Sequence, residues 1–442
     1  MSSVKFAPRA WFAAPVAALA IAVVGARLFD YHLRYRDPAF SYYWYWASGY
    51  ARGDLAIWRD CSYPPPFLAM FVPFTWLDPR LSWWIWQTLQ IAALAAALML
   101  FIREREESPD WKLLVIGLSL AFVFPQTLGS LYDAQPTPLL LLLLVLGWIN
   151  SRRGRSPLAG LCLAAAASLK LYPAAVGGYF LFRQRWREIL WAAVGVGLII
   201  PLTGLRAWYG ALFLGAPFYL NSRFWMGNER AVSLLQNACA LIDRVGLSPA
   251  ERQELGLPTI VALTAALLIV GAAAALTLIS GSTTQSDGLC FGLWLILLPL
   301  LSPVAWSQYA IVALPVYLVV AIGIYQTTNE FWSWRDSPRL FRTGVALLGF
   351  AIAGFTLPAF WGTLRSVHFY FFAMVASYLG TALCLYSSSY SSPNLSFQGS
   401  RHESTSLEFV PSMRERRLES VDACDPHSFA VGHLISERPD GV

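Results

Sequence analysis

The stretch "IVALTAALLIVGAAAALTLI" (Ile260–Ile279) runs for twenty residues without a charged side chain. A helix needs about 20 predominantly apolar residues to cross a bilayer. Two further runs, Ala10–Leu28 and Phe369–Leu385, come close to this standard. Across all 442 residues, 57% are hydrophobic and 13% are charged, whereas soluble domains carry roughly 25% charged residues. The sequence therefore predicts an all-α polytopic membrane protein.

Basic residues between the apolar runs predict the orientation of the chain. The net charge of +6 comes from Arg and Lys gathered in short loops, a pattern that sets membrane orientation and does not indicate nucleic-acid binding. Lys5 and Arg9 precede the first run, which favours a cytoplasmic N-terminus. Four more clusters act as cytoplasmic markers: Arg103/Arg105/Lys112, Arg152/Arg153/Arg155, Arg183/Arg185/Arg187 and Arg335/Arg339/Arg342. We expect about twelve crossings with both termini inside and a long first outer loop, at roughly 30–80.

The chain divides by composition into two parts. Residues 1–387 hold all the apolar runs, and we expect them to form one transmembrane domain. Residues 388–442 begin with a Ser-rich stretch and lack apolar periodicity, which predicts a disordered cytoplasmic tail. Within the first part, the pieces 157–169 and 173–182 resemble two half-length helices that meet at Lys170, because Pro173 prevents the first helix from continuing.

Unusual polar residues gather in the segments that this topology places outside, which predicts a single site at the outer membrane face. An ionisable residue at a membrane is costly to hold and is a functional candidate by default. Asp37 precedes an aromatic helix from Phe40 to Arg52 that ends at Gly53. It is either an Asp-Pro turn that caps this helix or a carboxylate base in an aromatic-walled pocket.

Lys170 also allows two interpretations. It lies between two apolar segments, so it is either a lysine that snorkels to the membrane surface or a positive charge that binds a lipid phosphate. Asp133 and Gln135 are candidates for the same site, with helix capping near Pro136 as the alternative explanation. No Ser-His-Asp set, phosphate-binding Walker loop, HExxH motif or metal-like cysteine spacing is present, so we expect no bound cofactor and name no metal-binding residues, while a need for a divalent metal stays open.

Several short motifs occur in an order that resembles a known family. After Asp37 and Gly53 come Tyr63-Pro64-Pro65 and Gln135-Pro136-Thr137-Pro138. "SLKLYPA" (Ser168–Ala174), "GNERAVS" (Gly227–Ser233) and "SPVAW" (Ser302–Trp306) complete the order. Over roughly residues 10–387 the chain resembles glycosyltransferase family 87, polytopic enzymes of the GT-C class that include mycobacterial mannosyl- and arabinosyltransferases.

The resemblance implies a GT-C type fold and an inverting glycosyltransferase in the plasma (inner) membrane with its active site on the outer face. Its donor would be a polyprenyl-phosphate sugar and its acceptor a lipid or a glycan. Asp37 best matches the catalytic acid, and Asp30 is its rival because Asp37 lies farther from Gly53 than is usual in the family. Lys170 and Arg230 would bind the donor phosphate. The substrate pocket would be lined by Tyr63, Tyr132, Asp133, Gln135, Tyr172, Asn228, Trp306 and Gln308.

Two other functions stay open on the sequence alone. Membrane transporters and lipid flippases also use broken helices and buried charges, although their sites lie near the bilayer midplane between repeats. A catalytically inactive relative is the second alternative. It follows from Ser307, Gln308 and Tyr309, which stand where relatives commonly carry an acidic residue and histidines.

Overall fold

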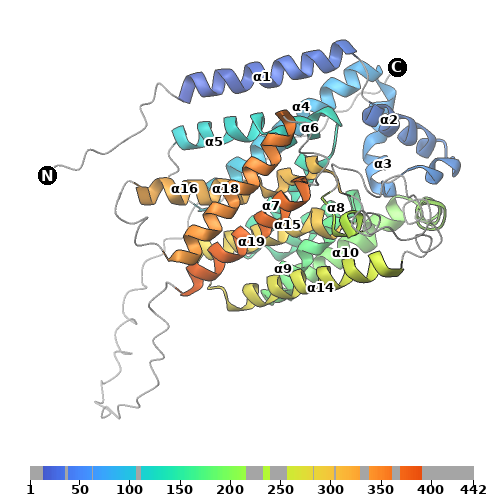
Figure 1. Ribbon diagram of the computed structural model, residues 1–442. Coiled ribbons are helices and arrows are strands. Elements are labelled where there is room, and N and C mark those ends of the chain that lie inside the picture. The colour runs from blue at the N-terminus through green and yellow to red at the C-terminus, as the bar shows by residue number, and fades with distance from the viewer. Residues whose placement is uncertain are drawn as a thin grey trace, which may run out of the picture. The chain divides into compact units, whose positions relative to one another are not determined.

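The computed structural model describes residues 13–34, 38–61, 63–105, 111–215, 232–238, 256–281, 283–302, 305–328, 338–360 and 369–390. Contacts divide the chain into Met1–Pro393 and Asn394–Val442. All the described residues belong to the first part (Figure 1). The expected tail lies outside the described residues except for residues 388–390, so its disorder stays a prediction.

The described residues form helices and turns, and they contain no β-strand. The longer helices are α1 (Ala13–Arg34), α2 (Pro38–Ala51), α4 (Pro79–Arg105), α5 (Trp111–Val123), α7 (Thr137–Arg152), α8 (Ser156–Leu169), α10 (Trp186–Leu202), α14 (Gly256–Ile279), α15 (Thr284–Leu301), α16 (Leu314–Thr328), α18 (Arg339–Phe360) and α19 (Phe369–Tyr390). Shorter helical pieces connect them: η2 (Ala56–Arg59), α3 (Pro65–Phe71), η3 (Val72–Trp76), α6 (Pro125–Tyr132), η4 (Tyr172–Val176), α9 (Gly177–Phe182), α11 (Leu205–Gly210), η5 (Ala211–Gly215) and η8 (Ser307–Ala313). The all-α prediction is confirmed for this part of the chain.

Four of the described helices are long and apolar enough to cross a membrane, and two bent pairs raise this number to six. The four are Pro79–Glu104, Thr259–Ile279, Arg339–Pro358 and Phe369–Ser388. The bent pairs are Leu114–Val123 with Pro125–Tyr132 and Trp186–Leu202 with Leu205–Leu214. Five shorter apolar helices of 10–17 residues accompany them. The apolar helices agree with a multi-pass membrane protein, whereas twelve crossings and a long first outer loop stay predictions.

Both bent pairs break where the backbone requires it. Phe124 has extended geometry, with φ −60° and ψ 127°, because the ring of Pro125 disfavours the helical conformation in the residue before it. The resulting bend between α5 and α6 is 59°. Gly204 has φ +87°, a value that glycine adopts at little cost, and α10 turns there by 100° into α11. The break expected near Lys170 also occurs, since α8 ends at Leu169 and Lys170 is extended.

The hydrogen bonds define two ends of the helical bundle. At one end, Lys170 follows the last residue of α8 and bonds to Gln135, which precedes α7. At the other end, Arg183 follows α9 and bonds to Ser280, which follows α14. The 16 residues of α7 connect the two ends, a length of about 24 Å at 1.5 Å per residue. We call these the Lys170 end and the Arg183 end.

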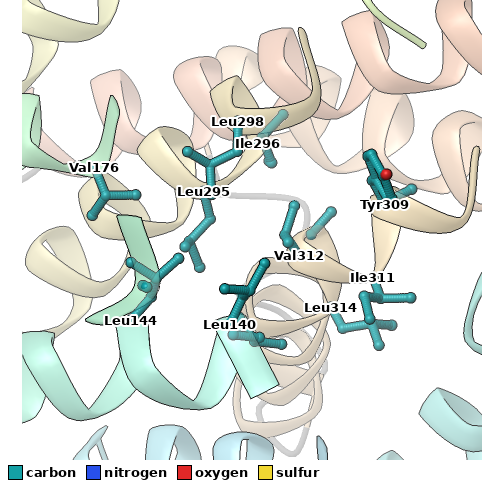
Figure 2. Close-up of a cluster of buried hydrophobic side chains, with 14 of the residues drawn as sticks. Leu140, Leu144, Val176, Leu295, Ile296, Leu298, Tyr309, Ile311, Val312 and Leu314 are labelled. Atoms are coloured by element: carbon teal, nitrogen blue, oxygen red, sulfur yellow. The ribbon is translucent and has the colours of Figure 1, made fainter. Parts of the chain in front are cut away.

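The hydrophobic core lies between these two ends, where α7, α15, η4 and η8 meet (Figure 2). Leu140 and Leu144 from α7 lie near Val176 of η4 and Leu295 of α15, and all four are buried. Ile311 and Val312 of η8 extend the same cluster. Tyr309 stands at its margin and carries the one polar side-chain atom among the labelled residues in the view. The core therefore extends to the Lys170 end, because Tyr309 belongs to the core and also contacts Lys170.

Helix α8 packs closely against its neighbour α10 through small residues. A Cβ atom added to Gly160 would lie 2.5 Å from the carbonyl oxygen of Glu188 and 2.5 Å from Cβ of Trp191. Small residues let helix backbones approach in this way where lipid supplies no hydrophobic driving force between helices. This contact sets the position of α8, and α8 in turn holds Lys170 at its end.

We expect Gly160→Ala to lower the free energy of unfolding by about 1–3 kcal/mol, because an added methyl in a packed interface forces neighbours to shift. Gly197→Ala is the matched control on α10, since nothing lies within 4 Å of its added Cβ. Thermal unfolding in detergent, followed by helical circular dichroism, measures both variants. Equal midpoints for the two variants would contradict close packing at Gly160.

Candidate functional site

Lys170 is buried at the end of α8, with 8% of the residue exposed. Its extended backbone turns the chain away from the helix before η4 begins at Tyr172. The ammonium nitrogen lies 4.1 Å from the ring centroid of Tyr309, 5.0 Å from that of Tyr63 and 5.6 Å from that of Tyr172. Aromatic faces attract cations electrostatically. Three rings from distant parts of the sequence therefore enclose one positive charge.

A hydrogen-bond network connects this lysine to the aromatic helix α2. Lys170 Nζ donates to Oε1 of Gln135 at 3.1 Å and to the hydroxyl oxygen of Tyr309 at 2.7 Å. The Tyr63 hydroxyl donates to the same oxygen of Gln135 at 3.0 Å. The hydroxyls of Tyr43 and Tyr63 are 2.8 Å apart. Because the Tyr63 proton is already used, Tyr43 is the donor in that contact.

Helix α4 fixes the turn that presents Gln135. Nε1 of Trp86 donates to the carbonyl oxygen of Ala134 at 2.8 Å, and Nε2 of Gln87 donates to that of Leu131 at 2.7 Å. Ala134 has φ +46°, a left-handed conformation that is uncommon for alanine. Such backbone outliers persist where the surroundings hold them, and they cluster at functional sites. Gln135 is thus held in place by side chains from another helix.

The electrostatics of Lys170 are those of a cation without a fixed counter-ion. No carboxylate among the described residues lies within 4.0 Å of its Nζ. Burial lowers the pKa of Lys170 well below its ordinary value, because the charged form loses water, so the positive charge is favoured most when an anion lies beside it. Its two hydrogen-bond partners are neutral, and an ammonium group has three protons to donate. An incoming anion would supply the missing charge and an acceptor for the third proton.

Two buried hydroxyls belong to the same end of the bundle. The side-chain oxygens of Thr137 and Tyr172 approach each other, and neither makes a well-aligned hydrogen bond among the described residues. An unpaired buried hydroxyl costs about 1–3 kcal/mol, so groups of this kind are usually satisfied in the working molecule. Thr137 begins α7 directly after Pro136, close to Gln135 in the chain. The Lys170 end therefore holds one amino group and a pair of buried hydroxyls that face each other.

The hydrogen bonds seen for Asp133 and Gln135 are made to other side chains and not to the start of α7. Pro136 is the N-cap of α7, and that helix start has no side-chain cap. Oδ2 of Asp133 instead accepts a hydrogen bond from Nε2 of Gln308 at 2.7 Å. The structure thus brings together Tyr63, Gln135, Lys170 and Tyr172 in one group, with the Asp133–Gln308 pair two residues from Gln135.

The remaining predicted residues are not brought to Lys170 by any described contact. Tyr132 is exposed beside Asp133, and Trp306 is partly buried at the start of η8. Asp30 lies on α1 and is partly buried. Asp37, Asn228 and Arg230 lie outside the described residues.

Two residues of the network were missed by sequence reasoning. Tyr309 occupies a position where the sequence analysis noted only a departure from the family pattern, yet its hydroxyl is the nearest partner of Lys170. Tyr43 belongs to a run of five aromatic residues, Tyr42–Trp46, on α2. Some of these side chains lie on a buried face of the helix and others on an exposed face. Tyr43 and Trp46 are buried, whereas Tyr42 and Tyr45 are more than half exposed. A spacing of three to four residues (Phe40, Tyr43, Trp46 and Ala47) was the available signal.

Curated relatives match the central part of the chain. One is a polyprenol-phosphate-mannose-dependent α-(1-2)-phosphatidylinositol pentamannoside mannosyltransferase of Mycolicibacterium smegmatis, which is 24% identical over 272 residues, or 59% of this chain and 61% of that protein. Another, from the same organism, is a polyprenol-phosphate-mannose-dependent α-(1-2)-phosphatidylinositol mannoside mannosyltransferase. It is 24% identical over 293 residues, 62% of this chain and 64% of its own length. The chain thus spans about three-fifths of the length of these relatives.

No solved structure gives a significant match. The family model of glycosyltransferase family 87 matches residues 62–303, which is more than half of the chain. The matched region contains Tyr63, Gln135, Lys170 and Tyr172, whereas Asp37 and Tyr309 fall outside it. On the extent of this match, the chain belongs to glycosyltransferase family 87.

Proposed function

We propose that the protein is an integral membrane glycosyltransferase that transfers a hexose or pentose from a polyprenyl-phosphate donor to a lipid or glycan acceptor. The observation that carries the proposal is the environment of Lys170, a buried amino group with neutral hydrogen-bond partners and, in the described part of the chain, no carboxylate within 4.0 Å. A lysine of this kind suits the phosphate of a lipid-linked sugar. The two relatives named above are polyprenol-phosphate-mannose-dependent mannosyltransferases, which supports the same donor class.

The proposed reaction is a single displacement with inversion at the anomeric carbon. The acceptor hydroxyl oxygen forms a bond to C1 of the sugar as the bond from C1 to the phosphate oxygen breaks. The hydroxyl proton passes to the carboxylate of Asp37, and the electron pair of the broken bond leaves with polyprenyl phosphate. The leaving phosphate gains one negative charge in this step. Lys170, with Arg230 as its assigned partner, would stabilise that charge, a large effect in a water-poor site.

The aromatic rings around Lys170 also favour the binding of a phosphate. The rings of Tyr63, Tyr172 and Tyr309 keep water away from the ammonium group, which strengthens its attraction to a phosphate. Tyr172 and Tyr309 are stacked, with ring centroids 5.7 Å apart. Stacked rings lose little entropy when a ligand binds, since they are already ordered. We assign the polyprenyl-phosphate group to this position and the acceptor to the neighbouring Asp133–Gln308 pair.

The position of Lys170 favours an enzyme over a transporter. The lysine lies at the end of α8 and next to the start of α7, whereas a transporter would hold its substrate midway between repeats. A site at the end of the bundle also suits a donor that arrives sideways through the membrane. We place this end at the outer membrane face, in agreement with the basic clusters at the opposite end.

The test of the proposal is a comparison of donor classes with purified full-length protein. We expect transfer of radiolabelled sugar from a panel of polyprenyl-phosphate sugars to lipid and glycan acceptors, and none from sugar nucleotides. A sugar nucleotide carries a diphosphate and no lipid tail, so it lacks the group that a membrane-edge site can hold. Transfer from sugar nucleotides alone would contradict the proposal. Movement of an intact lipid-linked sugar across vesicles without a new glycosidic bond would favour a flippase.

A further inference from the structure

A charged cavity lies at the Arg183 end of the bundle, away from the Lys170 end. Its volume is about 400 Å³, and it is lined by Arg152, Arg183, Arg185 and Asp287. These residues come from the ends of different helices: Arg152 ends α7, Arg183 and Arg185 join α9 to α10, and Asp287 lies in the first turn of α15. Separate parts of the chain thus contribute three arginines to one space.

The single acidic residue of the cavity is already occupied. Oδ1 of Asp287 accepts a hydrogen bond from the Tyr179 hydroxyl at 2.8 Å, and Oδ2 accepts one from Nε1 of Trp148 at 3.1 Å. Nε of Arg183 lies 3.5 Å from Oδ1 and forms an ion pair. Arg183 also donates to the carbonyl and hydroxyl oxygens of Ser280. Asp287 and Arg183 therefore pair with each other, and Arg152 and Arg185 are the other two cations that line the cavity.

Neutral and aromatic groups orient the other two arginines. Nη1 of Arg185 donates to the Ser151 hydroxyl oxygen at 2.5 Å, and Ser151 donates to Oε1 of Glu188 at 2.7 Å. The guanidinium of Arg152 lies 5.1 Å from the ring centroid of Trp148. Its distance to Glu104 is 3.8 Å, while Arg153 holds that carboxylate at 2.6 Å. Arg152 therefore lies over Trp148 and also pairs with Glu104, and Arg185 is held by Ser151, which in turn bonds to Glu188. Among the charged groups named here, four arginines (Arg152, Arg153, Arg183 and Arg185) face three carboxylates (Glu104, Glu188 and Asp287), an excess of one positive charge.

Exposed apolar residues lie close in the chain to the residues of this cavity. Trp186 follows Arg185 directly and is 62% exposed, and Leu190, one turn later on α10, is 64% exposed. Ile279, which precedes the Ser280 partner of Arg183, is 55% exposed. A basic cavity next to exposed apolar helix faces matches an anionic lipid, whose phosphate and acyl chains are joined at the membrane surface. A soluble phosphate would gain nothing from the apolar part.

We propose that this cavity binds the phosphate group of an anionic membrane lipid. Arg185 and Arg152 would donate hydrogen bonds to the phosphate oxygens, with the planar fork of arginine suited to a phosphodiester. The lipid would join the turns α7–α8, α9–α10 and α14–α15, which meet at this end. On the predicted orientation it belongs to the cytoplasmic leaflet. The proposal does not depend on the transfer reaction, and its test measures lipid binding alone.

The experiment measures equilibrium binding of a fluorescent phosphatidylglycerol to the full chain in neutral detergent. We expect Arg185→Gln to weaken binding about tenfold or more, since a hydrogen bond between charged groups is lost. Arg187→Gln is the matched control, because Arg187 is exposed and two residues away but does not line the cavity. It should bind like the wild type. Arg185→Lys, which keeps the charge and loses the fork, should give an intermediate affinity and guards against misfolding of the glutamine variant.

Three results would overturn the proposal. An equal loss of phosphatidylglycerol binding in the Arg185→Gln and Arg187→Gln variants would mean that the lipid responds to general surface charge and not to this cavity. Equal affinity for phosphatidylcholine would mean that a net negative lipid is not recognised. Inorganic phosphate that binds as tightly as phosphatidylglycerol, measured by competition, would assign the cavity to a soluble anion. Preference for phosphatidylglycerol that is lost in Arg185→Gln alone would support the lipid site.

Discussion

Replacement of Lys170 by methionine is expected to lower sugar transfer by about 10²–10³-fold, the effect of removing one preorganised group that stabilises developing charge. Methionine has a similar length and is apolar, so it fits among the rings of Tyr63, Tyr172 and Tyr309. The loss should appear in donor binding as well as in the rate, because the phosphate carries charge before and after the reaction. Initial rates and equilibrium binding of a polyprenyl-phosphate sugar measure both effects.

Protein stability separates this role from a structural one. A buried ammonium group loses hydration on folding, which is unfavourable, so Lys170→Met should leave the unfolding temperature unchanged or raise it. A lysine that mainly holds the fold together would give the opposite result. Tyr309→Phe serves as a milder variant, since it removes one hydrogen bond of Lys170 and keeps the charge. We expect it to retain transfer within about tenfold of the wild type. Full activity in Lys170→Met would remove Lys170 from the site.

The parts of the fold that follow from local chemistry were predictable from the sequence. Pro173 limits α8, and the helix indeed ends at Leu169, three residues before η4 begins. The aromatic helix expected from Phe40 to Arg52 is observed over Pro38–Ala51, and Gly53 has the left-handed φ of +72° that ends such a helix. In each case a single proline or glycine restricts the local backbone strongly. Contacts with residues far away in the sequence therefore have little influence on where the helix ends.

The contacts between distant segments were not predictable in the same way. Gln135 and Tyr63 were proposed as pocket residues, but nothing in their spacing shows that one amide oxygen accepts hydrogen bonds from both Tyr63 and Lys170. Tyr309 was missed because a tyrosine near the end of an apolar helix is common in membrane proteins. Which tyrosine faces a buried lysine depends on how α15 and η8 pack, and a single chain does not encode that packing in any short pattern.

The second large effect concerns the base. We expect Asp37→Asn to lower the transfer rate by about 10²–10⁴-fold, because general base catalysis contributes a factor of this size. Asparagine keeps the shape of the side chain and cannot accept the acceptor's proton. Donor binding should stay close to that of the wild type, since Asp37 is assigned to the acceptor hydroxyl and Lys170 to the phosphate. A rate that falls while donor affinity is kept therefore distinguishes the base from the phosphate-binding lysine.

Two other carboxylates provide the controls for this experiment. Asp30 lies on α1 and is the rival on family spacing, and Asp133 accepts the hydrogen bond of Gln308. Asp133→Asn should weaken binding of the acceptor, because it alters the Asp133–Gln308 pair to which the acceptor is assigned. It should still leave a measurable transfer rate. Asp30→Asn should retain near wild-type transfer. If Asp37→Asn stays active and Asp30→Asn does not, Asp30 on α1 is the base and Asp37 is not. If only Asp133→Asn is inactive, the proton is taken up beside Gln135, and the Lys170 network then holds both the base and the phosphate site.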